Sequence, residues 1–386
     1  MEILKARALL EGINVRPYKD VEELRTSLRY DDNDHPRSKY PRGGTEELLL
    51  LERKIANMFD LDQKQLVVFA YGMSGVVTSI ESASPTQGTV LLHGSNEYSN
   101  NKKYITNTLK KRGIIPITAT SYSVSYLNEL IHETNPKIIF LETVANGPEI
   151  PVLNIKDFFG LNILKKINPI IILDNTLASG IISPKEILNN DLRVIGVESG
   201  LKFYTKHKGS LGFIYTNDAE NISTLKELRK QTGTAPDLYQ TKHITEKLIG
   251  KWELFLRNKK IFKNAKLLAE LCHEAETPNS NFSISYPNLE NHKDTLYVNK
   301  TFPEGAAPLF FINSRNGKNQ FDIAEELFKN QIINDSCMII ESFGFDFTSI
   351  WPNSDLNFVR ISAGIEDESK IVNIGNALKE TLRKMN

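Results

Sequence analysis

The residues that could take part in chemistry stand at the ends of short apolar runs of the chain or within a few residues after them. Asp174 ends the run PIIILD, Asn146 follows KIIFLE, and Lys202 follows RVIGV within the segment ESGLKFY. The run LVVFA leads into the small-residue stretch 71–75, whose backbone N–H groups and helix dipole suit an anion. Taken singly, each feature has an ordinary explanation. Asp174 could be a helix cap or a surface acid, Asn146 a turn residue and Lys202 a solvated surface group, and the stretch 71–75 could be a tight turn.

Together, these groups match the needs of pyridoxal phosphate. This cofactor needs a lysine amine to bond with and a carboxylate to keep its ring nitrogen protonated. It also needs donors for its phosphate and commonly an aromatic ring to stack on. Lys202 and Asp174 supply the first two, and Tyr98 in HGSNEY can supply the ring, although a lone tyrosine is more often a core residue. We therefore expect pyridoxal 5'-phosphate as the cofactor and predict no metal site.

The elements that position these residues alternate along the chain. The predicted strands are 66–70, 89–93, 114–120, 137–142, 169–174, 193–197 and 211–216. A helix is expected from Glu46, and the segments YITNTLKKR, VSYLNELIHE and IKDFFGLNILKKI are expected to be helical. Continuous apolar strands between helices predict a mostly parallel sheet with helices on both faces. Ligands of such sheets bind at the carboxyl ends of the strands.

The pattern changes after about residue 240. A long helical stretch, YQTKHITEKLIGKWELFLRNKKIFKNAKLLAELCHEA, leads into fewer strands, PLFFIN, CMIIES and NFVRISA, and a closing helix. We predict a large cofactor-binding domain over 46–240 and a smaller α+β C-terminal domain over 241–386. Residues 1–45 are polar and are interpreted as a disordered tail or as an arm that contacts a neighbouring subunit.

Composition excludes several classes of partner. The chain has 386 residues, of which 40% are apolar and 24% charged, as in ordinary globular proteins. Lys plus Arg and Asp plus Glu both number 47, so charge gives no reason to expect nucleic acid or a membrane as partner. Two cysteines and the absence of a long apolar run or signal peptide predict a cytoplasmic protein.

In their order and spacing, the motifs resemble the cysteine/methionine-metabolism pyridoxal-phosphate enzymes. This family includes cystathionine γ-synthase, cystathionine γ-lyase, cystathionine β-lyase and methionine γ-lyase. FAYGMSG resembles F-A-S-G-M-A-A, LETVAN resembles L-E-T-P-S-N, LDNTLASG resembles V-D-N-T-F-A-T-P, and ESGLKFY resembles H-S-A-T-K-Y. Near the C-terminus, ESFG and VRISAGIED resemble E-S-L-G and V-R-L-S-V-G-I-E-D. The resemblance implies the aspartate-aminotransferase-like fold, pyridoxal-phosphate fold type I.

The resemblance also implies a role for each matching residue. Lys202, Tyr98 and Asp174 would be catalytic, with Lys202 bonded to the cofactor and Asp174 at its ring nitrogen. Tyr40-Pro-Arg42 looks like the family's Y-S-R, which reaches the phosphate of a neighbouring subunit and implies a homodimer or homotetramer. The substrate residues would be Arg360, Glu341 and Ser342, with Arg360 on the substrate carboxylate. The full cofactor set would be Tyr40, Arg42, Gly72, Met73, Tyr98, Asn146, Asp174, Ser199 and Lys202.

The chain departs from the family pattern near the expected pocket. Ser99-Asn100-Asn101 replaces the family's G-G-T after the stacking tyrosine, Leu201 replaces a threonine, and Tyr71 replaces a serine. Glu341 stands where a β-lyase tends to carry an aromatic residue. We expect γ-elimination or γ-replacement on an amino acid like cystathionine, methionine or a homoserine ester, as part of sulfur amino-acid metabolism. The alternatives are a β-lyase, a biosynthetic member acting on an unusual amino acid, a non-catalytic relative that binds the cofactor, or a purely structural scaffold.

Overall fold

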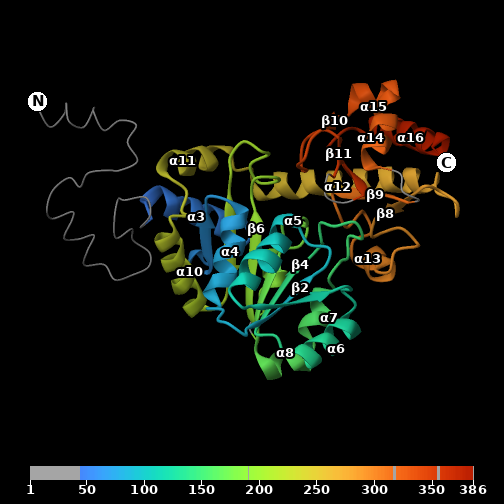
Figure 1. Cartoon of the computed structure of the whole chain (residues 1–386). Helices are drawn as coiled ribbons and strands as arrows, with labels where there is room; N and C mark the ends of the chain where they lie inside the picture. Colours follow the sequence, from blue (N-terminus) through green and yellow to red (C-terminus); the bar gives the residue numbers. More distant parts are fainter. Residues whose placement is uncertain (1–43, 190, 316–318, 354–356, 386) are drawn as a thin grey trace, which may run out of the picture. The chain divides into compact units, whose positions relative to one another are not determined.

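The computed structural model describes residues 44–189, 191–315, 319–353 and 357–385. They divide into two compact units, each built from two stretches of sequence. Unit 1 contains Met1–Pro85, described from residue 44, together with Pro184–Gly250, and unit 2 contains Thr86–Ser183 together with Lys251–Asn386. The predicted fold class is confirmed: the fold is mixed α/β, with a mostly parallel central sheet and a second sheet in the C-terminal region (Figure 1).

Unit 1 contributes antiparallel strands in the order β1–β7–β6. Its strands are β1 (Leu66–Phe69), β6 (Arg193–Ser199) and β7 (Gly212–Thr216). Its helices are α3 (Glu46–Met58), η2 (Gln63–Gln65), α4 (Gly72–Ser82), α9 (Pro184–Ile187), α10 (Ala219–Thr232) and α11 (Leu238–Lys247). The expected helix at Glu46 is confirmed: Thr45 Oγ1 caps it by accepting from Leu48 N at 3.2 Å, and its apolar face is buried.

Unit 2 holds the parallel strands, in the order β5–β4–β2–β3. They are β2 (Val90–Gly94), β3 (Ile115–Ala119), β4 (Ile138–Glu142) and β5 (Ile170–Asp174). Every residue of β4 and β5 is buried, which explains why these strands read as unbroken apolar runs. The nearby helices are α5 (Ser99–Lys103), η3 (Tyr104–Leu109, a π-helix), α6 (Val124–Thr134), α7 (Ile155–Phe159) and α8 (Asn162–Ile167).

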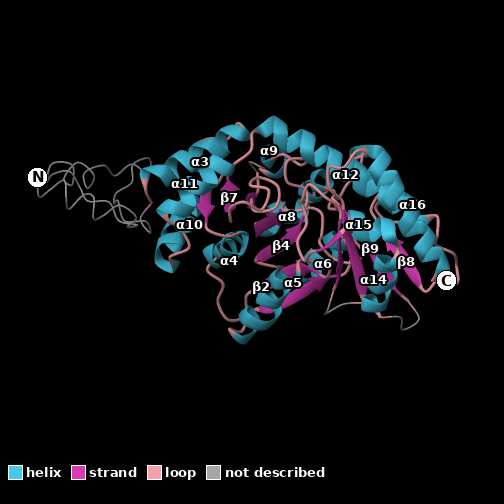
Figure 2. Cartoon of the chain, turned by 90° about the horizontal axis from the view of Figure 1, so that it is seen from above, coloured by secondary structure: helices cyan, strands magenta, loops and turns pink. Residues whose placement is uncertain are grey.

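The C-terminal part of unit 2 carries its own five-stranded sheet, in the order β10–β11–β12–β9–β8. The strands are β8 (Phe282–Ser285), β9 (Leu309–Ser314), β10 (Met338–Ile339), β11 (Ser349–Pro352) and β12 (Phe358–Ser362). The helices are α12 (Lys251–His273), α13 (Thr295–Thr301), α14 (Gln320–Lys329), α15 (Gln331–Ser336) and α16 (Glu368–Lys384). Helices α12 and α16 lie side by side (Figures 1 and 2).

Two expected helices are interrupted. The long stretch after residue 240 is two helices, because Leu248 has extended backbone with ψ 118° and α12 begins only at Lys251. The segment IKDFFGLNILKKI likewise splits into α7 and α8 at Gly160 and Leu161, where Leu161 is extended with ψ 117°. Among the described helices, none combines the length and the hydropathy needed to cross a membrane.

Candidate functional site

In unit 1, the start of α4 lies unusually close to the end of β6. A Cβ atom on Gly72 would stand 2.6 Å from the Ser199 Cβ, so only glycine allows this approach. Tyr71 precedes the helix without a side-chain cap, which leaves first-turn N–H groups of Gly72 and Met73 for another acceptor. Backbone N–H groups and a serine hydroxyl gathered at a helix start suit a phosphate.

Lys202 lies in the turn between β6 and β7 and is half-buried. The next two residues, Phe203 and Tyr204, are fully buried and anchor the turn. Tyr204 also donates its hydroxyl to Glu198 Oε2 at 2.5 Å, and Thr205 Oγ1 donates to the Leu201 carbonyl at 3.1 Å. The lysine is therefore carried by a tightly held turn that begins immediately after Ser199.

In unit 2, three strand ends are joined through one buried carboxyl group, that of Glu142. Its Oε1 accepts from Tyr98 N at 2.7 Å, and its Oε2 accepts from Asn146 N at 2.8 Å. Asn101 Nδ2 donates to Glu142 Oε1 at 3.2 Å and to Asp174 Oδ2 at 3.3 Å. The ends of β2, β4 and β5 thus bring Tyr98, Asn146 and Asp174 into one hydrogen-bonded group, as expected for parallel strands.

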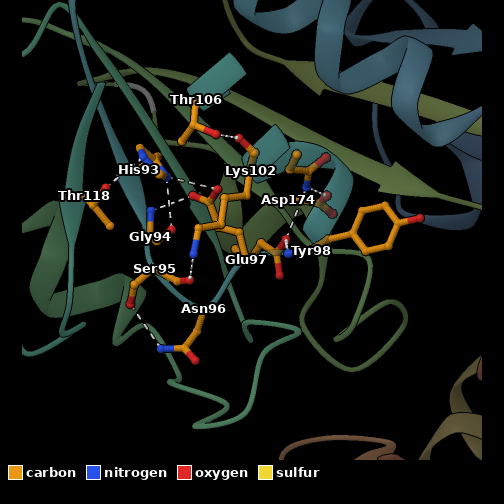
Figure 3. A network of polar contacts seen from close by, with 12 residues as sticks. His93, Gly94, Ser95, Asn96, Glu97, Tyr98, Lys102, Thr106, Thr118 and Asp174 are labelled. Atoms are coloured by element: carbon orange, nitrogen blue, oxygen red, sulfur yellow. Dashed lines mark hydrogen bonds and ion pairs between the residues drawn. The ribbon is translucent and has the colours of Figure 1, made fainter. Parts of the chain in front are cut away.

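A second buried acid, Glu97, extends this group toward His93. Glu97 Oε1 accepts from Gly94 N at 2.5 Å, and Glu97 Oε2 lies 3.3 Å from His93 Nδ1. His93 Nε2 in turn lies 3.1 Å from Thr118 Oγ1. Figure 3 shows the group, with His93 and Thr118 at one end and Asp174 and Tyr98 at the other.

Burial and like charge perturb these acids. Burial raises the pKa of Glu142 well above its ordinary value, and the negative charges of Asp174 and Glu97 raise it further. Burial also raises the pKa of Glu97, although the His93 side chain partly opposes the shift. Buried acids with pKa values shifted by desolvation and by neighbouring charges are typical of functional sites.

Arg360 on β12 forms a second group of predicted site residues. Its Nη2 donates to the backbone carbonyls of Glu341 and Ser342, the latter at 3.2 Å. Its guanidinium lies 5.7 Å from the Phe343 ring centroid. The Arg360 Nε is buried and has no hydrogen-bond partner among the described residues. Burial lowers the pKa of Arg360 to about 10, so the side chain stays charged at neutral pH.

The predicted residues therefore lie in groups within the two units. Unit 1 holds the residues expected at the phosphate and the lysine, and unit 2 holds the rest of the described set. Tyr40 and Arg42 lie outside the described residues. Sequence reasoning assigned no role to Glu97, Asn101 or Glu142, although Asn101 belongs to the departure from the family pattern at 99–101 and Glu142 ends a buried strand just as Asp174 does. The position of Glu142, an acid at the end of an otherwise apolar strand, could have marked it as a site residue.

The mixed α/β fold, with its mostly parallel central sheet and second C-terminal sheet, matches that of the pyridoxal-phosphate enzymes of fold type I. The model of one family, "Cys/Met metabolism PLP-dependent enzyme", matches residues 18–343. The chain belongs to this family, which confirms the resemblance and the cofactor inferred from the sequence. None of the curated proteins compared with the chain matches it.

Solved structures share the fold at low sequence identity. A Campylobacter jejuni protein assigned as O-acetylhomoserine (thiol)-lyase is 17% identical with a TM-score of 0.74, covering 95% of this chain and 92% of its own. Cystathionine γ-synthase from Xanthomonas oryzae is 17% identical with a TM-score of 0.73, covering 92% and 91%. The metB protein of Corynebacterium glutamicum is 18% identical with a TM-score of 0.72, covering 97% and 91%.

The chain's own residues fit the cofactor of the family. The close approach of Gly72 to Ser199 forms a cradle that a larger residue would fill. A half-buried lysine follows that cradle in unit 1, and a buried aspartate ends β5 in unit 2. An anion cradle, an amine and a carboxylate correspond to the phosphate, the aldehyde and the ring nitrogen of pyridoxal phosphate. The individual assignments remain predictions.

Proposed function

We propose that the chain catalyses γ-elimination or γ-replacement on an amino acid like cystathionine, methionine or a homoserine ester. The observation that carries the proposal is the buried Arg360 Nε, which has no partner among the described residues although the side chain is charged. An unpartnered buried donor of this kind is costly unless a ligand acceptor completes it. An amino-acid carboxylate is a well-suited acceptor, because a hydrogen bond from a charged guanidinium to a carboxylate is stronger than one between neutral groups.

The backbone contacts of Arg360 prepare it for that role. The carbonyls of Glu341 and Ser342 occupy its Nη2 and hold the planar group in one orientation, so less side-chain entropy is lost on binding. Glu341 is exposed and places a carboxylate beside this group, where β-lyases of the family tend to have an aromatic residue. A polar residue at this position favours substrates with γ-substituents over β-elimination.

The other residues divide the remaining chemistry. When bound, pyridoxal phosphate supplies an electron sink for charge that develops on the substrate α-carbon. Lys202, once free, would take the proton from that carbon and return one during departure of the γ-group. Asp174 would hold a proton on the ring nitrogen, and Tyr98 would stack on the ring and assist proton movement. Gly72, Met73 and Ser199 would bind the phosphate with neutral donors.

Product analysis tests the proposal. The purified holoenzyme is offered cystathionine, methionine, cysteine and an O-acylhomoserine, and keto acids, thiols and new amino acids are measured. We expect turnover of a γ-substituted substrate and none in Lys202→Ala, with Lys208→Ala as a matched lysine control in the same turn. Turnover of cysteine alone would favour the alternative of a β-lyase. Borohydride-fixed cofactor on a lysine other than Lys202 would contradict its assignment.

The carboxylate assignment has a separate test. Arg360→Ala should weaken amino-acid binding roughly tenfold to a hundredfold, since a charge-assisted hydrogen bond to the substrate carboxylate is lost. Cofactor affinity should change by no more than about twofold on this scale. Arg360→Lys keeps the charge but not the fork and should fall between wild type and Arg360→Ala. Unchanged amino-acid affinity in both variants would place the carboxylate site elsewhere.

We further propose that the active unit is a homodimer or a homotetramer with shared sites. The support is the sequence alone: Tyr40-Pro-Arg42 resembles the family's intersubunit phosphate motif, and the described phosphate donors are all neutral. Mixing inactive Lys202→Ala subunits with inactive Arg42→Ala subunits should restore part of the activity, because a hybrid dimer regains one intact site. No recovery despite demonstrated subunit exchange would rule out sharing.

A further inference from the structure

Asn101 occupies a position between two acids of unit 2. It lies in α5, three residues after Tyr98, and only 1% of its surface is exposed. One nitrogen, Nδ2, donates both to Glu142 Oε1 at 3.2 Å and to Asp174 Oδ2 at 3.3 Å. A carboxamide nitrogen carries two hydrogens, so each acid can receive its own.

The orientation of this carboxamide follows from charge. Its Oδ1 is buried and has no hydrogen-bond partner among the described residues. Turning the amide over would give no relief, because the oxygen would then face the carboxyl oxygens of Glu142 and Asp174 without donating a hydrogen to either. Asn101 therefore keeps its two N–H groups on the acids and leaves its own acceptor unsatisfied. The free-energy cost of the unsatisfied Oδ1 indicates that the two hydrogen bonds to Glu142 and Asp174 have a role.

The contact completes a fixed geometry for Asp174. Thr176 N donates to Asp174 Oδ1 at 2.9 Å, and Asn101 donates to Oδ2, so a donor stands at each oxygen. The same carboxamide ties Asp174 to Glu142, which the backbone N–H groups of Tyr98 and Asn146 hold in place. The plane of the Asp174 carboxylate is thus set from three strand ends at once.

We propose that Asn101 is a positioning residue that orients the Asp174 carboxylate for the cofactor's ring nitrogen. The proposal rests on the proposed function, in which Asp174 is the ring-nitrogen partner. Two N–H donors serve two acids, whereas the threonine of the family's Y-G-G-T at this position has a single O–H to donate. The pattern at 99–101, a departure from the family, therefore has a physical role.

The test compares four variants of the holoenzyme: Asn101→Leu, Asn101→Thr, Asp174→Asn and the control Asn288→Ala. Asn288 is also a buried asparagine of unit 2 whose Nδ2 donates twice, to Asn299 Oδ1 at 2.8 Å and to the Phe302 carbonyl at 3.0 Å. The first readout is the ¹⁵N resonance of the ring nitrogen in labelled pyridoxal phosphate, which reports its protonation. The others are the cofactor dissociation constant, kcat and KM.

For Asn101→Leu we expect the ring-nitrogen resonance to move toward the unprotonated position. We also expect kcat to fall roughly tenfold to a hundredfold, the scale of hydrogen bonds to a charged group, with KM changed less than about threefold. Asn101→Thr should be intermediate, and Asn288→Ala should leave the resonance unchanged. A general loss of packing would not produce this spectral change selectively.

Two outcomes are kept apart. If Asp174→Asn removes ring protonation but both Asn101 variants keep the wild-type resonance and kcat, Asn101 is structural and the inference is overturned. If Asp174→Asn itself leaves the resonance unchanged, the assignment of Asp174 in the proposed function fails instead. Should Asn101→Leu not bind the cofactor, a wild-type resonance and rate in Asn101→Thr overturns the inference, because the second N–H is then not needed.

Discussion

Both units bury acidic side chains, but the groups that surround the buried carboxyl differ between the two units. In unit 1, Glu52 is 1% exposed and its Oε1 receives Arg229 Nη1 at 2.6 Å and Val68 N at 3.0 Å. In unit 2, Glu142 receives only neutral donors in its described hydrogen bonds, and the largest charge effects on its pKa come from two other acids. The first arrangement neutralises a charge for folding. In the second, burial and neighbouring acids raise the pKa of Glu142, which disfavours its charged form.

The largest effect should come from breaking the neutralised pair. Glu52→Ala leaves the buried Arg229 guanidinium without its carboxylate, and we expect a loss of about 3–5 kcal/mol in the free energy of unfolding. Urea denaturation measures it. The double variant Glu52→Leu/Arg229→Met serves as the control and should lose much less, because no buried charge is left unpaired. Equal losses in the two variants would mean that the pair contributes through shape alone.

The next effect should be catalytic and confined to unit 2. Asp174→Asn should lower kcat about a hundredfold to a thousandfold, the scale of removing one preorganised electrostatic partner. Its stability should change little or improve, because the charge of Asp174 raises the pKa of Glu142. Steady-state kinetics and denaturation of the same preparation provide both numbers. Near wild-type kcat would make Asp174 a structural acid like Glu52.

The raised pKa of Glu142 should make the free energy of unfolding depend on pH. Its pKa is raised in the folded state, so its proton is retained after the unfolded chain has released it. Stability from this group is therefore full below the unfolded pKa and is lost as pH rises toward the folded pKa. Relative to Glu142→Gln, the wild type should lose stability with rising pH above about 4.5, by at most about 1.4 kcal/mol per pH unit for a single group. If the stability of wild type and of Glu142→Gln changes with pH in the same way, the pKa of Glu142 is not raised in the folded state.

The smallest effect should come from the far end of the network. Thr118→Val removes the hydroxyl 3.1 Å from His93 Nε2 while keeping the side-chain shape. Thr118 is an exposed residue, so the expected loss of stability is roughly 0.5–1 kcal/mol. Thermal unfolding at several pH values measures it. A loss above about 2 kcal/mol would contradict this expectation, because a single hydrogen bond of an exposed hydroxyl contributes less than that.

The sequence predicted the strand ends well, because β4 and β5 are buried on both faces and read as unbroken apolar runs. Asp174 stood out as an acid at the end of such a run, and Lys202 as an amine a few residues after another. The partners of Asp174 did not stand out: Asn101 is 73 residues away along the chain, and its role depends on which strand ends become neighbours. The break between α11 and α12 was also missed, although Gly250 marked it.

The division of unit 1 into two stretches has a consequence for synthesis on the ribosome. Strand β1 pairs with β7, which is made about 140 residues later. At ordinary elongation rates this delay is on the order of ten seconds, during which the apolar segment LVVF lacks the strand with which it pairs. Fragments that end before Gly212 should therefore aggregate, because the nascent chain completes this part of the sheet only when β7 emerges.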